Sequence, residues 1–147
     1  MSTQTAQATQ VYRVSIEATA EQVWEAITRP EWSAQYFFGA RVTVVPDHYM
    51  SLGPEGDAWV DAGVEEFDPP RRLVHGWRSL YDPELATEPE SRVTWEIEQQ
   101  PNGGCLLTVT HDKLEASPKT ASGVSGGWQG IVERLKELLE TGAVTQG

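Results

Sequence analysis

The sequence predicts an α+β fold in which a curved antiparallel β-sheet of about six to seven strands wraps around a long C-terminal helix. Short β-forming runs separated by turn residues fill the middle of the chain, which is typical of an antiparallel sheet. The amphipathic stretch at 122–142 is long enough to cover the apolar face of that sheet. The chain of 147 residues suffices for one domain, expected at 11–142 between flexible tails at 1–10 and 143–147.

The domain is predicted to begin with one strand and two short helices. Residues 11–18 alternate between apolar and polar side chains, as a half-buried strand does. Thr19 and Gln22 have the spacing of a capping box and precede apolar residues at helical intervals. Pro30 ends this helix and suits the first position of a second one, expected at 31–37. The two helices therefore follow the first strand directly.

The middle of the chain is predicted to form a meander of strands. Clusters of proline, glycine, asparagine and aspartate interrupt the β-forming runs and mark the turns between them. Segment 81–90 combines prolines and acids without any period, so it is predicted to be an exposed loop, and 113–121 to be a linker. The strands are expected at 42–45, 48–52, 58–67, 72–79, 92–99 and 105–112.

The last helix carries one apolar stripe and an unusual number of glycines. Gly142 is placed where a C-cap glycine belongs, whereas Gly126, Gly127 and Gly130 each cost about 0.5–1 kcal/mol relative to alanine inside a helix. Close packing against a neighbouring element is one explanation, and space for a ligand beside Trp128 is the other. The stripe consists of Val124, Trp128, Ile131, Leu135 and Leu138.

Composition narrows the classes of partner. The formal net charge of -11 argues against binding to nucleic acid or to an anionic bilayer, because both would repel the chain. Cys105 is the single cysteine, so no intrachain disulfide forms. Residues 1–10 have no apolar run of the kind found in secretion signals or membrane spans. A cytoplasmic protein without membrane insertion is therefore expected.

Aromatic side chains from several predicted elements are expected to point toward one interior. They either fill the core or line a ligand-sized cavity, and their convergence from several sides, with glycines beside Trp128, favours the cavity. Trp59 alternates with the apolar residues Ala58, Val60 and Ala62 along its predicted strand, so either face of that strand could point inward. The predicted ligand-binding residues are Trp32, Tyr36, Phe37, His75, Trp77, Trp95, His111, Trp128, Ile131 and Leu135.

Two histidines are the candidates for catalysis. His75 and His111 fall on the apolar side of their strands, where a histidine is more often a hydrogen-bonded core residue than a catalyst. A near-neutral pKa nevertheless makes them the first choice for a general acid or base. No metal site is expected, because His48, His75, His111 and Cys105 lack zinc-ligand spacing, and no cofactor motif is present.

The sequence resembles the START-like, or SRPBCC, helix-grip superfamily, and within it the branch related to the C-terminal domain of the activator of the ninety-kilodalton heat-shock chaperone ATPase. The resemblance is carried by VWEAITRPE at 23–31, FDPPRRLV at 67–74 with Trp77, SRVT at 91–94, LTVTH at 107–111, and GGW at 126–128 leading to Leu135 and Leu139. It implies a helix-grip fold over nearly the whole chain. YFF at 36–38 departs from the tryptophan often found in that segment of the family.

Three functions are compatible with the resemblance, since the superfamily includes binding proteins, cyclases and co-chaperones. The leading hypothesis is a binding protein that holds a small hydrophobic or aromatic molecule between the last helix and the sheet. A cyclase or dehydratase using His75 or His111 is the second, and a co-chaperone that stimulates a chaperone ATPase is the third. A homodimer is also compatible with the sequence. We expect Gly130→Leu to block ligand uptake while leaving the fold largely intact.

Overall fold

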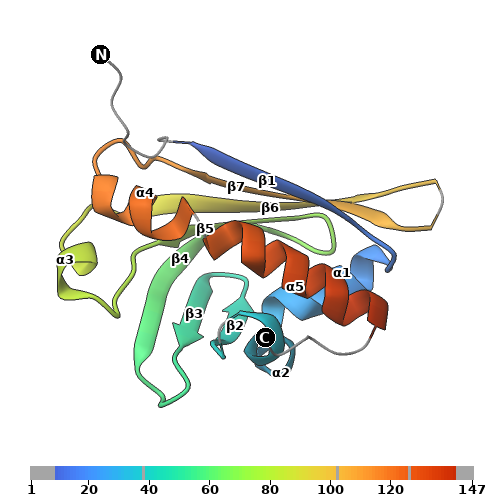
Figure 1. Ribbon diagram of the computed structural model, residues 1–147, viewed down its shortest axis with the longest axis horizontal. Helices are drawn as coiled ribbons and strands as arrows, with labels where there is room; N and C mark the ends of the chain where they lie inside the picture. The colour runs from blue at the N-terminus through green and yellow to red at the C-terminus, as the bar shows by residue number, and fades with distance from the viewer. Residues whose placement is uncertain (1–8, 38, 102, 126, 142–147) are drawn as a thin grey trace.

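The computed structural model describes residues 9–37, 39–101, 103–125 and 127–141. Its strands form a seven-stranded sheet in the order β1-β7-β6-β5-β4-β3-β2, and every neighbouring pair is antiparallel. The sheet curves, and the long helix α5 crosses in front of it in Figure 1, with α1 and α2 beside the C-terminal part of that helix. The helix-grip fold expected from the sequence is confirmed.

The observed strands agree closely with the predicted ones. The sheet consists of β1 (Gln10–Ile16), β2 (Arg41–Val45), β3 (His48–Leu52), β4 (Ala58–Asp68), β5 (Arg72–Trp77), β6 (Ser91–Gln99) and β7 (Cys105–Asp112). The helices are α1 (Ala20–Thr28), α2 (Pro30–Tyr36), α3 (Pro83–Ala86), α4 (Pro118–Ser125) and α5 (Gly127–Thr141). The first strand begins one residue earlier than predicted, because Gln10 pairs with His111 and its side chain donates to the Ala121 carbonyl at 3.0 Å.

The predicted start of the first helix is confirmed in detail. The backbone N–H of Gln22 donates to the Thr19 hydroxyl at 3.1 Å, and the Thr19 N–H donates to the Gln22 side chain at 2.9 Å. These reciprocal bonds form a capping box, which satisfies amide groups that the first helical turn leaves unpaired. Pro30 is the first residue of α2, where its missing N–H costs nothing.

Two predictions for irregular segments were wrong. The loop predicted at 81–90 contains α3, whose N-cap Asp82 accepts from the Glu84 N–H at 2.8 Å. The linker predicted at 113–121 contains the start of α4, so the expected single C-terminal helix is two helices. The Glu88 carboxylate, distant in sequence, accepts the backbone N–H groups of Lys119 at 3.0 Å and Thr120 at 2.8 Å, and thereby stabilises the first turn of α4.

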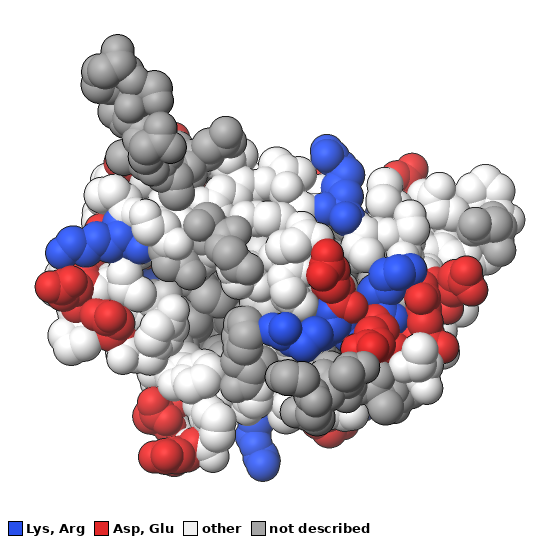
Figure 2. All heavy atoms as spheres, viewed as in Figure 1, with Lys and Arg blue, Asp and Glu red and all other residues white. Residues whose placement is uncertain are grey.

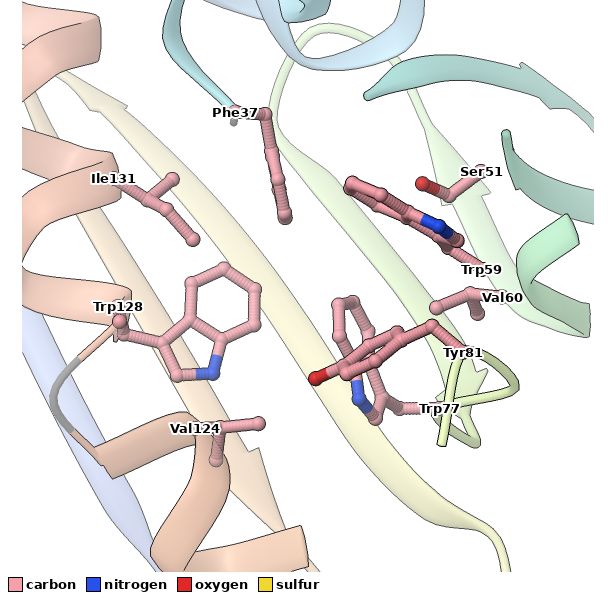
Figure 3. A pocket seen from close by; sticks show the side chains of 10 residues that line it. Phe37, Ser51, Trp59, Val60, Trp77, Tyr81, Val124, Trp128 and Ile131 are labelled. Atoms are coloured by element: carbon pink, nitrogen blue, oxygen red, sulfur yellow. The ribbon is translucent and has the colours of Figure 1, made fainter. Parts of the chain in front are cut away.

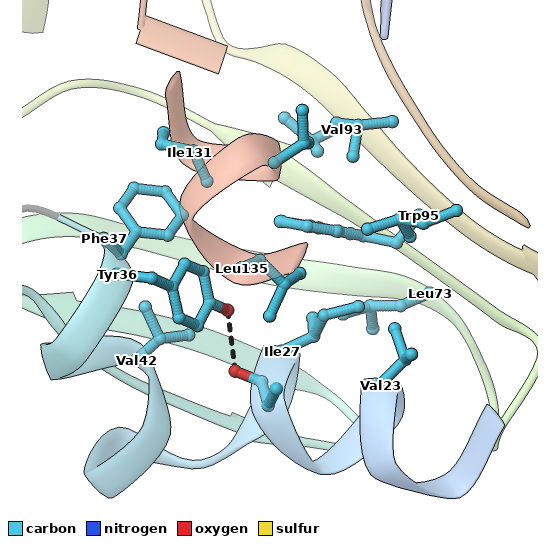
Figure 4. Packing of buried hydrophobic residues seen from close by; sticks show 14 of the residues in the cluster. Val23, Ile27, Tyr36, Phe37, Val42, Leu73, Val93, Trp95, Ile131 and Leu135 are labelled. Carbon is cyan, nitrogen blue, oxygen red and sulfur yellow. Dashed lines mark hydrogen bonds between the residues drawn. The ribbon is translucent and has the colours of Figure 1, made fainter. Parts of the chain in front are cut away.

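The apolar stripe of α5 lies buried against the sheet, as predicted. Figure 4 shows Leu135 on this helix beside Trp95 and Leu73 of the sheet, and Ile131 beside Phe37. The stripe residues Trp128, Ile131, Leu135 and Leu138 are all buried. Full burial of an apolar side chain of this size contributes about 1.5–3 kcal/mol, so this face fixes the helix on the sheet. Residues 1–8 of the tail predicted at 1–10, the tail predicted at 143–147 and the cap at Gly142 lie outside the described residues, and Gln10 belongs to β1.

Candidate ligand cavity between helix α5 and the sheet

A cavity of about 270 Å³ lies between the start of α5 and the sheet. Its walls come from β3, β4, β5, α4 and α5, from Phe37 directly after α2, and from the segment that follows β5. Figure 3 shows these side chains arranged around one space. The described residues that line it are Phe37, Ser51, Trp59, Val60, Trp77, Tyr81, Val124, Gly127, Trp128 and Ile131.

Aromatic rings in mutual contact form the inner part of the cavity. The ring of Phe37 stacks on Trp77 with centroids 6.4 Å apart and meets Trp128 edge to face at 5.9 Å. The rings of Trp77 and Trp128 also contact each other, with centroids 5.5 Å apart. Such contacts add to the energy of burial and hold large rings in fixed orientations. The inner walls are therefore rigid, flat and apolar.

Trp59 and Tyr81 form the outer part of the cavity. Their rings meet at a centroid distance of 5.8 Å, and Tyr81 is 51% exposed to solvent. A β-bulge places Trp59 there: Ser51 pairs with Val60 and Leu52 pairs with Ala58, so Trp59 is the extra residue. The bulge brings Trp59 and its neighbour Val60 to the same cavity, which strict alternation along a strand does not allow.

The position of Trp59 depends on a turn beneath it. Its indole N–H donates to the Asp57 carboxylate at 3.0 Å, and its ring covers Gly53. A Cβ atom at Gly53 would lie 2.5 Å from Cε2 of Trp59, which is closer than such atoms approach. Gly53 is therefore needed for this position of the outer wall.

Two buried tryptophan–histidine hydrogen bonds lie behind the cavity wall, on the side of the core. Nε1 of Trp128 donates to Nδ1 of His111 at 3.0 Å, and Nε1 of Trp95 donates to Nε2 of His75 at 3.0 Å. The second nitrogen of His111 contacts the Ser91 hydroxyl at 2.7 Å, and that of His75 contacts the Gly76 carbonyl at 2.8 Å. Since each imidazole accepts from an indole, the other ring nitrogen is the donor, and both rings are neutral.

Burial governs the titration of both histidines. It lowers the pKa of His75 to about 3 and that of His111 to about 4, because the protonated ring loses its hydration. The face of His75 also stacks on the ring of Tyr49, with centroids 3.7 Å apart. All four ring nitrogens thus bond to protein groups, and the histidines act as fixed hydrogen-bond acceptors for two buried tryptophans.

Sequence and structure comparisons place this architecture in a family. The profile of the family described as activator of Hsp90 ATPase homolog 1-like protein matches residues 17–140. The chain belongs to this family. The resemblance inferred from the sequence is thereby confirmed. No curated protein matches the sequence.

Solved structures confirm the fold of this family member. DynU16, described as a putative protein in the dynemicin biosynthetic locus, is 26% identical with a TM-score of 0.76; the match covers 96% of this chain and 50% of DynU16. An HSP90 activator from Plasmodium falciparum is 17% identical with a TM-score of 0.73, covering 91% and 97% of the two chains. Protein MLL2253 from Mesorhizobium loti is 22% identical with a TM-score of 0.72, covering 90% and 96%.

The cavity brings together some of the predicted ligand-binding residues and leaves others in the core. Phe37, Trp77, Trp128 and Ile131 line it. The other predicted residues lie outside the lining. Trp32 is partly buried against the core, and Tyr36, His75, Trp95, His111 and Leu135 are fully buried in it.

Tyr36 illustrates the difference between an inward side chain and a cavity side chain. Its hydroxyl donates to the Ala26 carbonyl at 2.6 Å, drawn as the dashed line in Figure 4. This bond joins α2 to α1 and directs the ring into the packed core. The ring contacts Phe37, whose own ring faces the cavity. The segment that includes both residues therefore contributes one structural and one cavity-lining aromatic side chain.

Six of the ten lining residues were not among the ligand-binding residues predicted from the sequence. Val124 belongs to the predicted apolar stripe but is not one of the predicted ligand contacts. Trp59 was ambiguous because of the bulge, and Tyr81 belongs to a segment predicted to be an exposed loop. The sequence signal for the cavity is the set of aromatic residues that precede, end and follow β5 in the chain, namely Trp59, Trp77 and Tyr81. The lining residues not predicted are Ser51, Trp59, Val60, Tyr81, Val124 and Gly127.

Gly130, which was expected to leave space for a ligand beside Trp128, does not line the cavity. A Cβ atom at this position would lie 3.2 Å from Nη1 of Arg134. Gly127, the first residue of α5, does line it. Gly126 lies outside the described residues.

The part of the chain that the structure describes holds no group of three or more His, Cys, Asp or Glu residues able to bind a metal. No helix in that part is long and apolar enough to cross a membrane.

Proposed function

We propose that this protein binds a small hydrophobic or aromatic molecule in the cavity between α5 and the sheet. The observation that carries the proposal is the aromatic lining of a space of about 270 Å³ that is bounded by Tyr81, a half-exposed side chain. A dry apolar cavity of about 150 Å³ is enough to bind benzene, so this space suits a molecule of about two fused rings. Small-molecule sites are typically concave and mostly apolar, with few polar groups.

The energetics favour an apolar ligand. Transfer of apolar surface out of water contributes about 25 cal/mol per Å², and preformed aromatic walls require little reorganisation on binding. The ring pairs among Phe37, Trp77 and Trp128 give the walls this preformed character. A planar ring system gains further from stacking on them.

The hydrogen bonds of His75 and His111 favour a ligand-binding function over catalysis by these two histidines. His75 and His111 would have to give up an indole donor or a protein acceptor before either ring could exchange a proton with a substrate. A general acid or base needs a nitrogen within hydrogen-bond reach of the substrate. The cyclase or dehydratase alternative therefore has no supporting observation among the described residues.

Isothermal titration calorimetry with 2-naphthylmethanol tests the proposal. Val124→Phe adds a ring inside the cavity, and Val11→Phe is the matched control, because Val11 lies on β1, is 43% exposed and does not line the cavity. We expect saturable 1:1 binding by the wild type and Val11→Phe, and a loss of about tenfold or more with Val124→Phe. Equal affinities of all three proteins, or no binding below about 1 mM, would contradict the proposal.

A co-chaperone role is the second candidate, favoured by membership of a family whose description names the Hsp90 ATPase. The test measures the steady-state ATPase rate of purified Hsp90, taken from the organism that makes this protein, with increasing amounts of this protein. A saturable increase supports the role, and a rate that stays at its basal value removes it.

Cytoplasmic location and homodimer formation stay predictions. Cell fractionation tests the location, and light scattering tests the oligomeric state.

A further inference from the structure

The described lining of the cavity contains no charged side chain. Its ten residues are apolar or aromatic, apart from the hydroxyl groups of Ser51 and Tyr81 and the glycine backbone. The residues outside the described ranges carry no Lys, Arg, His, Asp or Glu, so none of them brings a charged side chain to this space. A charge on a ligand held there would have no side-chain counter-ion from the cavity wall.

The indole N–H groups around the cavity already have partners in the protein. Nε1 of Trp77 donates to the Ser79 hydroxyl at 3.1 Å, and Nε1 of Trp128 donates to His111. Nε1 of Trp59 donates to the Asp57 carboxylate. These three tryptophans therefore present ring faces and edges to a ligand, and their polar atoms point into protein hydrogen bonds. A carboxylate would find no indole donor without breaking one of those bonds.

Acidic side chains surround the outer part of the cavity. Asp57 lies directly beneath Trp59, and Asp82 follows Tyr81 in the chain. Figure 2 shows red side chains gathered over α3 and over the turn between β3 and β4, on either side of mostly uncharged surface. Lys119, a cation beside α3, is paired with Glu84 at 3.4 Å. The net charge of -11 adds a general repulsion toward anions.

We infer that the cavity selects an uncharged planar aromatic molecule and discriminates against carboxylates of the same shape. The inference rests on the proposed ligand-binding function. Its physical basis is the high free-energy cost of moving an ionised carboxylate from water into a mostly apolar site that offers hydroxyl groups but no side-chain counter-ion. The acidic surroundings make a smaller contribution, because exposed charges are screened by water and salt.

Two probes of matched shape test the selection: 2-naphthylmethanol, which is neutral, and 2-naphthoate, which is an anion at pH 7.5. We expect 2-naphthoate to bind the full chain about 100-fold or more weakly than 2-naphthylmethanol in calorimetric titrations. Equal affinities for the two probes would overturn the selection and leave the ligand-binding function in place. Failure of both probes to bind would overturn the ligand-binding function, and the selection with it.

A cation placed at the outer wall gives an independent test. Tyr81→Arg brings a guanidinium to a half-exposed cavity residue, and Tyr81→Gln is the uncharged control that also removes the ring. We expect the ratio of naphthoate to naphthylmethanol affinity to be about tenfold or more higher in Tyr81→Arg than in Tyr81→Gln. The same ratio in both variants would contradict the inference that a missing counter-ion sets the selection.

Discussion

The indole N–H of Trp128 on α5 donates to Nδ1 of His111 on β7 at 3.0 Å. The other nitrogen of His111 donates to the Ser91 hydroxyl on β6 at 2.7 Å, and Ser91 donates to the carbonyl of Trp77 on β5 at 3.2 Å. A single series of buried hydrogen bonds thus joins the helix to three adjacent strands. Trp128 and Trp77, at its two ends, are both cavity walls, so this series sets their relative position.

The bond between Trp128 and His111 is expected to show energetic coupling. Trp128→Phe and His111→Phe each leave a buried polar group without its partner, which costs about 1–3 kcal/mol in the free energy of unfolding. The double variant removes both groups, so its loss is expected to fall short of the sum by about 0.5–3 kcal/mol. Urea unfolding of the four proteins measures the coupling. Strictly additive losses would show that the bond contributes nothing.

The buried histidines make stability depend on pH in a defined direction. Folding lowers the pKa of His75 to about 3 and of His111 to about 4, whereas an unfolded histidine titrates near about 6.5. Below that value the unfolded chain binds more protons than the folded one. Stability is therefore complete above about pH 7 and falls as pH decreases from about 6.5, by about 1.4 kcal/mol per pH unit for each histidine.

The double variant His75→Phe with Trp95→Phe isolates one histidine from this effect. It removes donor and acceptor together, so no buried polar group of this pair is left unpaired. Between pH 6.5 and pH 5, we expect its free energy of unfolding to fall about half as steeply as that of the wild type. Urea titrations at several pH values give the two slopes. Equal slopes would mean that His75 is not kept neutral by burial.

The fold was predictable because its signals are local. The capping box at Thr19 depends on residues three apart, and the alternation that places His75 and His111 inside is visible within each strand. Helix α4 was not predictable in this way, because Glu88, which stabilises its first turn, lies about thirty residues earlier in the chain. Local patterns therefore give the elements, and contacts between distant segments decide where some of them begin.

The candidate site was predictable only in part, because cavity lining depends on register. His75 lies opposite Val93, and Trp95 lies opposite Leu73, so His75 and Trp95 are diagonal neighbours on one face. Their hydrogen bond follows from this register, which no single strand encodes. The bulge at Trp59 likewise places its side chain at the same cavity as that of its neighbour Val60, which the sequence pattern left open. Aromatic residues were thus correctly expected inside, while their division between cavity and core required the structure.

Gly53 is expected to control the outer wall of the cavity. Gly53→Ala places a methyl group against the ring of Trp59, and overpacking of this kind costs about 1–3 kcal/mol of stability or displaces the ring. Gly63→Ala on β4 is the matched control, since a Cβ atom there has no neighbour within 4 Å. We expect weaker 2-naphthylmethanol binding or lower stability only for Gly53→Ala. If both variants matched the wild type in stability and in affinity for 2-naphthylmethanol, this account of Gly53 would be wrong.

Gly130 is expected to affect the helix and not the ligand. Gly130→Ala removes the conformational cost of glycine inside α5, and the new methyl group meets only the end of the long Arg134 side chain. The free energy of unfolding should rise by about 0.5–1 kcal/mol, with no change in affinity for 2-naphthylmethanol. Thermal unfolding and calorimetry measure the two quantities. A large loss of affinity would place Gly130 at the ligand after all.

The most direct test of ligand binding in the cavity is an NMR experiment on methyl-labelled protein. Val124 and Ile131 line the cavity, whereas Val11 and Val45 are exposed at 43% and 44% and do not line it. With 2-naphthylmethanol bound, we predict intermolecular nuclear Overhauser effects from the ligand protons to the methyl groups of Val124 and Ile131. Contacts to Val11 or Val45 instead, or no intermolecular contact at saturation, would contradict the account.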